Sequence, residues 1–270
     1  MAPVAKRVSE EIETGSRLEV AEAAAREAGD LILEMVRDGR AAHVETKGLR
    51  NLVTAADHAA EDLVRARLAA AFPRDRIAGE EGGESGAESD FVWWVDPLDG
   101  TTNFVHGHPF HAVSVGLAVR GTPVLGAICG PALGEVFTGE VGRGAWRNGA
   151  PIAVSATGDL ADSLLATGFA YNRNDVPDNN LDTFSKMSLL VRGLRRAGAA
   201  SLDLAFVACG ILDGFWERYL APWDVCAGAA IVRAAGGAVS DFEGGGGFLL
   251  GEQIVASNGR LHEAIRTNVR

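Results

Sequence analysis

Two stretches near the start of the chain carry apolar residues at helical spacing. Residues 16–35 open with a Ser-x-x-Glu capping box and then repeat Leu, Ala, Ile and Met at intervals of three and four. Residues 54–71 open with Thr-x-x-Asp, show the same spacing and must end before Pro73, because a residue in front of proline disfavours the helical conformation. The sequence therefore predicts two amphipathic helices joined by a polar segment.

The pattern then changes from helical to strand-like. Residues 91–95, Phe-Val-Trp-Trp-Val, form a continuous apolar run that ends in acids, which is typical of a strand buried on both faces and delivers Asp96 to its end. Alternation over 113–119, an Arg-Gly-Thr-Pro turn and a return over 124–129 predict a hairpin, and Asn148-Gly149 predicts another. We expect the first half to be two helices over an antiparallel meander.

The second half alternates between the two kinds of element. Strands are predicted at 164–167, 213–219 and 253–256, and helices at 181–192, at 201–212 and from 224 to a stop at 236–237. Such alternation is typical of α/β structure. We therefore expect a frayed segment over 1–15, an α+β half over 16–155 and an α/β half over 156–270.

The chain has an excess of acidic residues. Its 270 residues include 36 Asp plus Glu against 25 Lys plus Arg, a net charge of −11, which argues against a protein that binds nucleic acid by neutralising phosphates. The three cysteines lie far apart, so neither a disulfide framework nor a zinc site is expected. No apolar run approaches the roughly 18 residues of a membrane span. These features predict a cytoplasmic protein that binds neither nucleic acid nor a membrane.

The densest acidic cluster outside the helices begins at Gly-Glu-Glu over 79–81 and continues through Asp96 and Asp99. These two aspartates lie three residues apart around Pro97, so in a tight turn their carboxylates converge. Two carboxylates about 4 Å apart repel by roughly 4 kcal/mol at an effective dielectric constant of 20, and a divalent cation removes that penalty. Oxygen-only ligation favours Mg²⁺ or Mn²⁺ over zinc.

A simple turn and a calcium loop both compete with a magnesium site at these acids. Asp-Pro and Asp-Gly form turns in most proteins, which accounts for the pattern without any ligand. A calcium-binding EF-hand fails, because counting Asp96 as the first position puts Leu98 third and Gly107 twelfth. The Gly100-Thr101-Thr102 segment favours a site, since glycine permits close approach and the following N–H and hydroxyl groups suit a phosphate oxygen.

These motifs resemble those of the inositol monophosphatase family, which are lithium-sensitive, magnesium-dependent phosphatases. The matching segments are Gly-Glu-Glu over 79–81, Trp-Val-Asp-Pro-Leu-Asp-Gly-Thr-Thr-Asn-Phe over 94–104, Pro-Trp-Asp-Val-Cys-Ala-Gly over 222–228 and Val-Arg-Ala-Ala-Gly-Gly over 232–237. The similarity spans about residues 17–268. Motifs in this order and spacing make the match far more specific than a lone turn motif.

The resemblance implies a fold and an activity. The fold would be the layered αβαβα sandwich of the inositol monophosphatase and fructose-bisphosphatase type. The activity would be hydrolysis of a phosphate monoester of a small polyol, first of all inositol 1-phosphate, by water activated by two or three Mg²⁺ ions, for which Mn²⁺ can substitute. Lithium sensitivity and a homodimer are implied as well. The alternatives are a histidinol-phosphate phosphatase, or a bacterial family member with an additional regulatory binding role.

The same resemblance assigns metal ligands and a catalytic group. Glu80, Asp96 and the Leu98 carbonyl would hold one Mg²⁺, and Asp96, Asp99 and Asp224 would hold a second. Thr101, hydrogen-bonded to Asp57, would orient and deprotonate the water, with Glu80 counted in the catalytic group. Two structural alternatives stay open, because Asp57 fits a capping box and Asp224 fits a helix N-cap.

The substrate contacts follow from the resemblance too. Phosphate would bind at Gly100, Thr101 and Thr102, and the alcohol at Ala199, Ala200, Glu217 and Asp224, with Lys47 on a loop over the metals. Structurally, Lys47 fits a solvated side chain and Glu217 fits an exposed strand end. The family often carries a hydroxyl residue after the glycine of the substrate turn, and Gly198-Ala199-Ala200 lacks it. The missing hydroxyl favours an enzyme that accepts several polyol phosphates.

Overall fold

The two predicted N-terminal helices form as α2 (Thr14–Arg37) and α3 (Ala55–Ala71) in the computed structural model, which describes residues 14–40, 44–48 and 51–270. Thr54 is the extended N-cap of α3, and its hydroxyl accepts a hydrogen bond from Ala56 N at 3.2 Å. The helix ends two residues before Pro73, as predicted. Most of the predicted frayed segment, 1–15, lies outside the described residues.

The first half of the chain builds a sheet of eight strands. They are β3 (Arg76–Gly79), β4 (Gly83–Ser85), β5 (Phe91–Asp99), β6 (Ala112–Val119), β7 (Thr122–Gly130), β8 (Glu135–Glu140), β9 (Gly144–Arg147) and β10 (Ala150–Ile152), in the order β10-β9-β8-β7-β6-β5-β3-β4. All neighbours are antiparallel except β3 and β5. Both predicted hairpins are confirmed, with left-handed residues at Arg120-Gly121 and Asn148-Gly149.

The second half builds a mixed sheet of five strands. They are β11 (Leu164–Thr167), β12 (Gly193–Arg195), β13 (Gly214–Arg218), β14 (Ala238–Ser240) and β15 (Gln253–Ser257), in the order β12-β11-β13-β15-β14. The helices are α5 (Leu181–Ser188), α6 (Ala200–Ala208), α7 (Pro222–Ala234) and α8 (His262–Val269). The predicted helix 181–192 is too long, because the chain leaves it to pair β12 with β11. The predicted helix 201–212 ends early, before Gly210 in the left-handed region.

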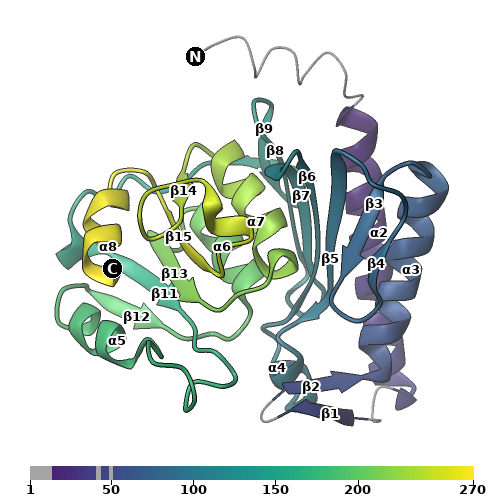
Figure 1. Ribbon diagram of the computed structural model, residues 1–270, viewed down its shortest axis with the longest axis horizontal. Coiled ribbons are helices and arrows are strands. Elements are labelled where there is room, and N and C mark those ends of the chain that lie inside the picture. The colour runs from purple at the N-terminus through teal and green to yellow at the C-terminus, as the bar shows by residue number, and fades with distance from the viewer. Residues whose placement is uncertain (1–13, 41–43, 49–50) are drawn as a thin grey trace.

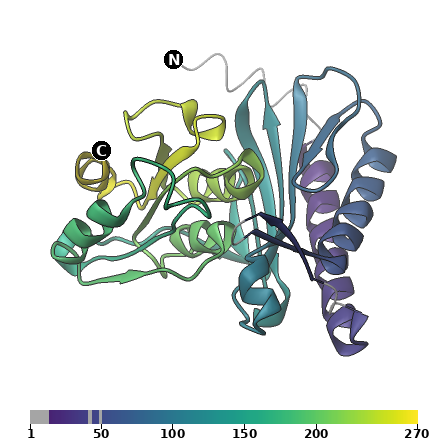
Figure 2. The ribbon, with the colours of Figure 1, turned by 60° about the horizontal axis from the view of Figure 1, so that its bottom comes forward.

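Three smaller elements complete the fold. A hairpin of β1 (Val44–Gly48) and β2 (Asn51–Thr54) forms where only a polar connection was predicted, and α4 (Thr101–Val105) follows β5. Figures 1 and 2 both show α4 and this hairpin at the same end of the first sheet. None of the helices within residues 14–40, 44–48 and 51–270 has the length and apolar character needed to cross a membrane.

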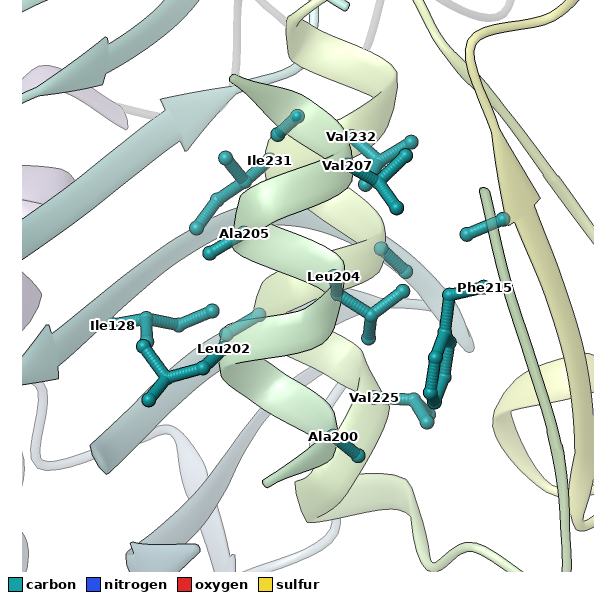
Figure 3. Packing of buried hydrophobic residues seen from close by; sticks show 14 of the residues in the cluster. Ile128, Ala200, Leu202, Leu204, Ala205, Val207, Phe215, Val225, Ile231 and Val232 are labelled. Carbon is teal, nitrogen blue, oxygen red and sulfur yellow. The ribbon is translucent and has the colours of Figure 1, made fainter. Parts of the chain in front are cut away.

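The elements stack in five layers, as Figure 1 shows: α2 and α3, the first sheet, α6 and α7, the second sheet, and α5 with α8. This is the predicted αβαβα sandwich. Three clusters of apolar residues fill the interfaces between layers. The cluster around α6 and α7 contains residues of both sheets. In Figure 3, Ile128 of the first sheet and Phe215 of the second lie on opposite sides of α6 and α7, with Leu202 and Val225 filling the space between.

A row of glycines seats α7 on the first sheet. Gly116, Gly126 and Gly139 are direct partners across β6, β7 and β8. A Cβ added at these positions would lie 2.5 Å from Ala227 N, 2.4 Å from Ala227 O and 2.9 Å from Ile231 Cα. The helix backbone therefore lies closer to the sheet than any side chain would permit. This close approach fixes where the first turn of α7 sits above β5 and β6.

Candidate active site

Strand pairing places Glu80 beside Asp96. In the parallel pair β3–β5, Gly79 is opposite Val95, and the Glu80 N–H continues the pairing by donating to the Val95 carbonyl at 3.2 Å. The next residue on each chain is an acid. The parallel pairing of β3 with β5 thus brings the two carboxylates together, as the resemblance implied for the first metal.

Asp96 and Asp99 lie in one strand rather than in the predicted tight turn. Asp96 is opposite Ser114 and Asp99 is opposite Ala112, so β5 carries one more residue than β6 between them and forms a bulge. The Leu98 N–H donates to Asp96 Oδ1 at 3.0 Å and closes this bulge. The extra residue, not a turn, brings the two aspartates to the same end of the sheet.

Asp99 is held by the first turn of α6. Its Oδ2 accepts hydrogen bonds from Ser201 N at 2.7 Å and Ser201 Oγ at 2.5 Å. Burial raises the pKa of Asp99 to about 6, although the Ser201 hydrogen bonds lower it in part. The sequence marked Ser201 only as the start of a helix, so its contact with Asp99 was missed.

Asp224 occupies the first turn of α7 and comes from the other half of the chain. Its Oδ2 accepts a hydrogen bond from Ala221 N at 2.7 Å, so Asp224 is not the predicted N-cap but the third residue of the helix, bonded to the backbone of the N-cap residue Ala221. Burial raises the pKa of Asp224 well above its ordinary value, and the charges of Asp99 and Glu80 raise it further. Asp224 therefore bonds to the start of α7 and also interacts electrostatically with Asp99 and Glu80.

The four carboxylates thus act on one another. Burial raises the pKa of Asp96 well above its ordinary value, with Glu80, Asp99 and Asp224 adding their charges in that order. Asp96 is 2% exposed. Within the described part of the chain, however, no three carboxylate, imidazole or thiol groups are already gathered as a metal-binding cluster. A divalent cation would offset the repulsion, but the side chains must adjust to meet on it.

Asp57 makes the contacts of both interpretations that the sequence left open, the helix cap and the bond to Thr101. Its Oδ2 caps α3 by accepting from Thr54 N at 2.8 Å and from the Thr54 hydroxyl at 2.6 Å. Its Oδ1 lies 3.3 Å from the Thr101 hydroxyl, which is also 3.0 Å from the Leu98 carbonyl. Burial is the main cause of the raised pKa of Asp57. The Thr101–Asp57 contact implied by the resemblance is therefore present.

The predicted phosphate segment begins at Gly100, a position that no other residue type suits. Gly100 has φ 87°, and a Cβ there would lie 3.0 Å from the Phe110 carbonyl and 3.2 Å from the Gly198 carbonyl. Thr101 is buried and Thr102 is exposed. Lys47 lies in β1, but its side chain is outside the described residues. The structure therefore brings the glycine-threonine segment next to the Gly198 turn and leaves the lysine untested.

Two adjoining cavities open beside these acids. The inner one, of about 110 Å³, is lined by Asp99, Asp203, Glu217 and Asp224 together with Ala199, Ala200 and the backbone around Gly168. The outer one, of about 590 Å³, is lined by Leu52, Thr102, Phe169, Tyr171, Arg173, Leu181, Arg196 and Gly198. Four residues line both cavities, so the two adjoin each other. The inner cavity is lined by four acids and Arg196, whereas the charged residues lining the outer one are Arg173 and Arg196.

Glu217 is buried, so its interpretation as an exposed strand end is wrong. It lies in β13 with 9% of its surface exposed, and burial raises its pKa to about 8, with the charge of Asp203 adding to the shift and Arg196 opposing it. A Cβ added to Gly168 would lie 2.1 Å from Glu217 Oε1. The glycine therefore makes room for the carboxyl group, a relation that no pattern in the sequence signals.

Comparisons with known proteins identify the family of the chain. The profile of the Inositol monophosphatase family matches residues 14–270. The chain is 42% identical over 250 residues to an inositol-1-monophosphatase of Synechocystis sp., covering 92% of this chain and 86% of that protein. It is 43% identical over 258 residues to the Nus factor SuhB of Pseudomonas aeruginosa, covering 94% and 95%.

Solved structures agree as well. The inositol monophosphatase from Anabaena (Nostoc) sp. superposes with a TM-score of 0.87 at 39% identity, covering 96% of each chain. The family profile spans residues 14–270, and the alignments cover 86% and 95% of the length of the two relatives. The protein therefore belongs to the inositol monophosphatase family.

Proposed function

We propose that the protein is a Mg²⁺-dependent phosphatase that hydrolyses phosphate monoesters of small polyols, with inositol 1-phosphate as the first candidate substrate. The observation that carries this proposal is the set of four acids, Glu80, Asp96, Asp99 and Asp224, whose charges act on one another beside a cavity. Asp96 is buried and the other three are half-buried, so their mutual repulsion destabilises the fold unless cations or protons neutralise them. A site for oxygen-loving divalent cations explains why they are there.

The acids divide into two overlapping ligand sets. Glu80, Asp96 and the Leu98 carbonyl would hold one ion, and Asp96, Asp99 and Asp224 a second, with Mn²⁺ as the substitute for Mg²⁺. When bound, the ions would polarise the phosphate and lower the pKa of a water at the site. The Leu98 residue lies in the bulge between Asp96 and Asp99, which supports its part in this ligand set.

Thr101 and Asp57 would orient the water that attacks the phosphate. The Thr101 hydroxyl lies between Asp57 Oδ1 and the Leu98 carbonyl, so it is anchored at the edge of the proposed metal site. Its oxygen can accept a hydrogen bond from the attacking water while its own proton is donated to Asp57 or Leu98. The raised pKa of Asp57 suits a group that shares a proton with Thr101. Gly100 and Thr102 complete the proposed phosphate contacts.

The alcohol would enter from the outer cavity. Glu217 with a pKa of about 8 is protonated at neutral pH in the absence of cations and can donate a hydrogen bond to a substrate hydroxyl. Ala199 and Ala200 offer backbone groups and no hydroxyl. Because the resemblance assigns only the Glu217 and Asp224 side chains to the alcohol, we expect modest differences among polyol phosphates. Lys47 on β1, lithium sensitivity, a cytoplasmic location and a homodimer belong to the proposal through the family alone.

A panel of substrates tests the proposal. Purified protein with Mg²⁺ is assayed on inositol 1-phosphate, glycerol 2-phosphate and histidinol phosphate. Comparable efficiencies on the first two support the proposal. A preference for histidinol phosphate by several orders of magnitude would replace it with the histidinol-phosphatase alternative.

A second candidate function is a regulatory role like that of a Nus factor. One observation favours it: the relative named Nus factor SuhB is 43% identical and covers 94% of the chain, which is as close as the inositol-1-monophosphatase of Synechocystis sp.. A variant that lacks turnover, such as Asp96→Asn, separates the two functions. Complementation by this variant in a strain that lacks the gene would show that the second role is independent of catalysis.

A further inference from the structure

Helix α3 presents two buried carboxylates to two different parts of the site. Asp57 and Glu61 lie four residues apart and therefore share one face of the helix. Asp57 contacts Thr101, whereas Glu61, 2% exposed, reaches the turn between β3 and β4. That turn contains Glu80.

Glu61 accepts three hydrogen bonds, two of them from the backbone of this turn. Its Oε2 accepts from Glu81 N at 2.8 Å, and its Oε1 accepts from Gly82 N at 2.8 Å and from Arg65 Nε at 2.6 Å. Arg65 in turn donates to the Ser85 hydroxyl at 3.0 Å and to the Gly83 carbonyl. One helix face thus holds both the turn and the strand that follows it.

The turn is shaped to receive this carboxylate. A Cβ added to Gly79 would lie 2.4 Å from Glu61 Oε1, and one added to Gly82 would lie 2.8 Å from the same atom. Neither glycine has a left-handed φ, so backbone conformation does not require glycine at these two positions. Glycine is instead required because any side chain there would occupy the space of the Glu61 carboxylate.

The opposite side of the turn is fixed by the sheet, where the Glu80 N–H donates to the Val95 carbonyl at 3.2 Å. Glu80 is thus held between β5 and α3. The charges of Asp96 and Asp224 interact unfavourably with Glu80 and act to push it away from the site. Charge-assisted hydrogen bonds to backbone N–H groups resist such a displacement.

We propose that Glu61, paired with Arg65, is a positioning residue that holds Glu80 against Asp96 and thereby sets the affinity of the site for its divalent cation. The proposal rests on the proposed function, since it assumes that Glu80 is a metal ligand. In this proposal Glu61 acts through its hydrogen bonds to Glu81 N and Gly82 N and not as a metal ligand. Outer partners of this kind commonly change metal affinity by about 10–100-fold when removed.

The test is Glu61→Gln, with Asp62→Asn as the matched control. Asp62 is exposed on the same helix and also loses one charge. A glutamine amide would place an N–H group against a donor of the turn, or against Arg65, and would carry no charge. We expect Glu61→Gln to raise the Mg²⁺ concentration for half-maximal rate by about 10-fold or more, while kcat at saturating Mg²⁺ changes by less than about 3-fold. Asp62→Asn should match the parent.

A readout independent of turnover is Mn²⁺ binding measured by electron paramagnetic resonance, which should weaken by a similar factor. If Glu61→Gln is too unstable to purify, Gly82→Ala applies the same displacement from the turn, because its Cβ meets Glu61 Oε1. A parent-like response to both metals in either soluble variant overturns the proposal. If Asp96→Asn also binds Mn²⁺ like the parent, the metal site itself has failed, and the proposed function fails with it.

Discussion

Replacing Glu217 by glutamine should stabilise the metal-free protein at neutral pH and leave its stability unchanged in acid. Burial raises the pKa of this carboxyl from 4.5 to about 8, with the charge of Asp203 adding to the effect. Above pH 4.5 the unfolded chain releases the proton, while the folded protein retains it until about pH 8. Stability is therefore lost as the pH rises through this range. Glutamine is a neutral side chain of the same shape and carries no such penalty.

The size of the effect follows from the two pKa values. Each pH unit above 4.5 costs the folded protein about 1.4 kcal/mol, so at pH 7 the carboxyl destabilises the fold by about 3 kcal/mol. Glu217→Gln should recover most of this difference at pH 7 and none of it at pH 4. The Gly168 backbone next to the carboxyl accommodates the amide, since the two side chains have nearly equal volume.

The assay is urea unfolding with excess chelator at several pH values between 4 and 8, followed by circular dichroism. The exposed Glu88, changed to glutamine, serves as the control and should show no pH-dependent difference from the parent. The difference in unfolding free energy between Glu217→Gln and the parent should grow from near zero at pH 4 to about 3 kcal/mol at pH 7. A difference that is constant across pH, or that favours the parent at pH 7, would show that the buried carboxyl does not carry a raised pKa.

Three further predictions concern the site. Thr101→Ala should lower kcat by roughly 100-fold or more without changing the Mg²⁺ concentration for half-maximal rate, because it removes a group that handles the proton and not a metal ligand; steady-state kinetics checks it. Lithium should inhibit uncompetitively with substrate, as the family resemblance implies, and purely competitive kinetics or resistance would count against it. Gly126→Val should displace α7 and Asp224, since even a Cβ would lie 2.4 Å from the Ala227 carbonyl oxygen. We expect the free energy of unfolding to fall by about 1–3 kcal/mol and Mn²⁺ binding to weaken. A variant with unchanged stability and Mn²⁺ binding would contradict the close packing of α7 on the first sheet.

Local features were predictable from the sequence. The Thr54 cap of α3 depends on four consecutive residues, and the buried strand over 91–95 depends on one apolar run, although β5 continues past Asp96 to Asp99. The β6–β7 hairpin follows from alternation and a two-residue turn. In each case the deciding interactions lie within a few residues, so the pattern contains the answer.

Features that depend on distant contacts were not predictable. Strands β12 and β14 have three residues each, too few to show the alternation of apolar and polar residues typical of a strand. They form because they pair with β11 and β15. The contacts of Ser201 with Asp99 and of Glu61 with the 80–82 turn join segments that only the packed layers bring together. The roles of the acids themselves came from the family motifs, because an aspartate that caps a helix and one that binds a metal have the same local pattern.

The decisive experiment for the proposed phosphatase is phosphate release from inositol 1-phosphate, measured across a Mg²⁺ titration for the parent and for Asp96→Asn. We expect saturable activation of the parent by Mg²⁺, loss of activity in excess chelator and recovery on adding Mg²⁺ or Mn²⁺. Asp96→Asn should fold, resist denaturation at least as well as the metal-free parent, and release almost no phosphate at any Mg²⁺ concentration. Equal rates with chelator and with Mg²⁺, or parent-like turnover by Asp96→Asn, would contradict a metal-dependent phosphatase built on these acids.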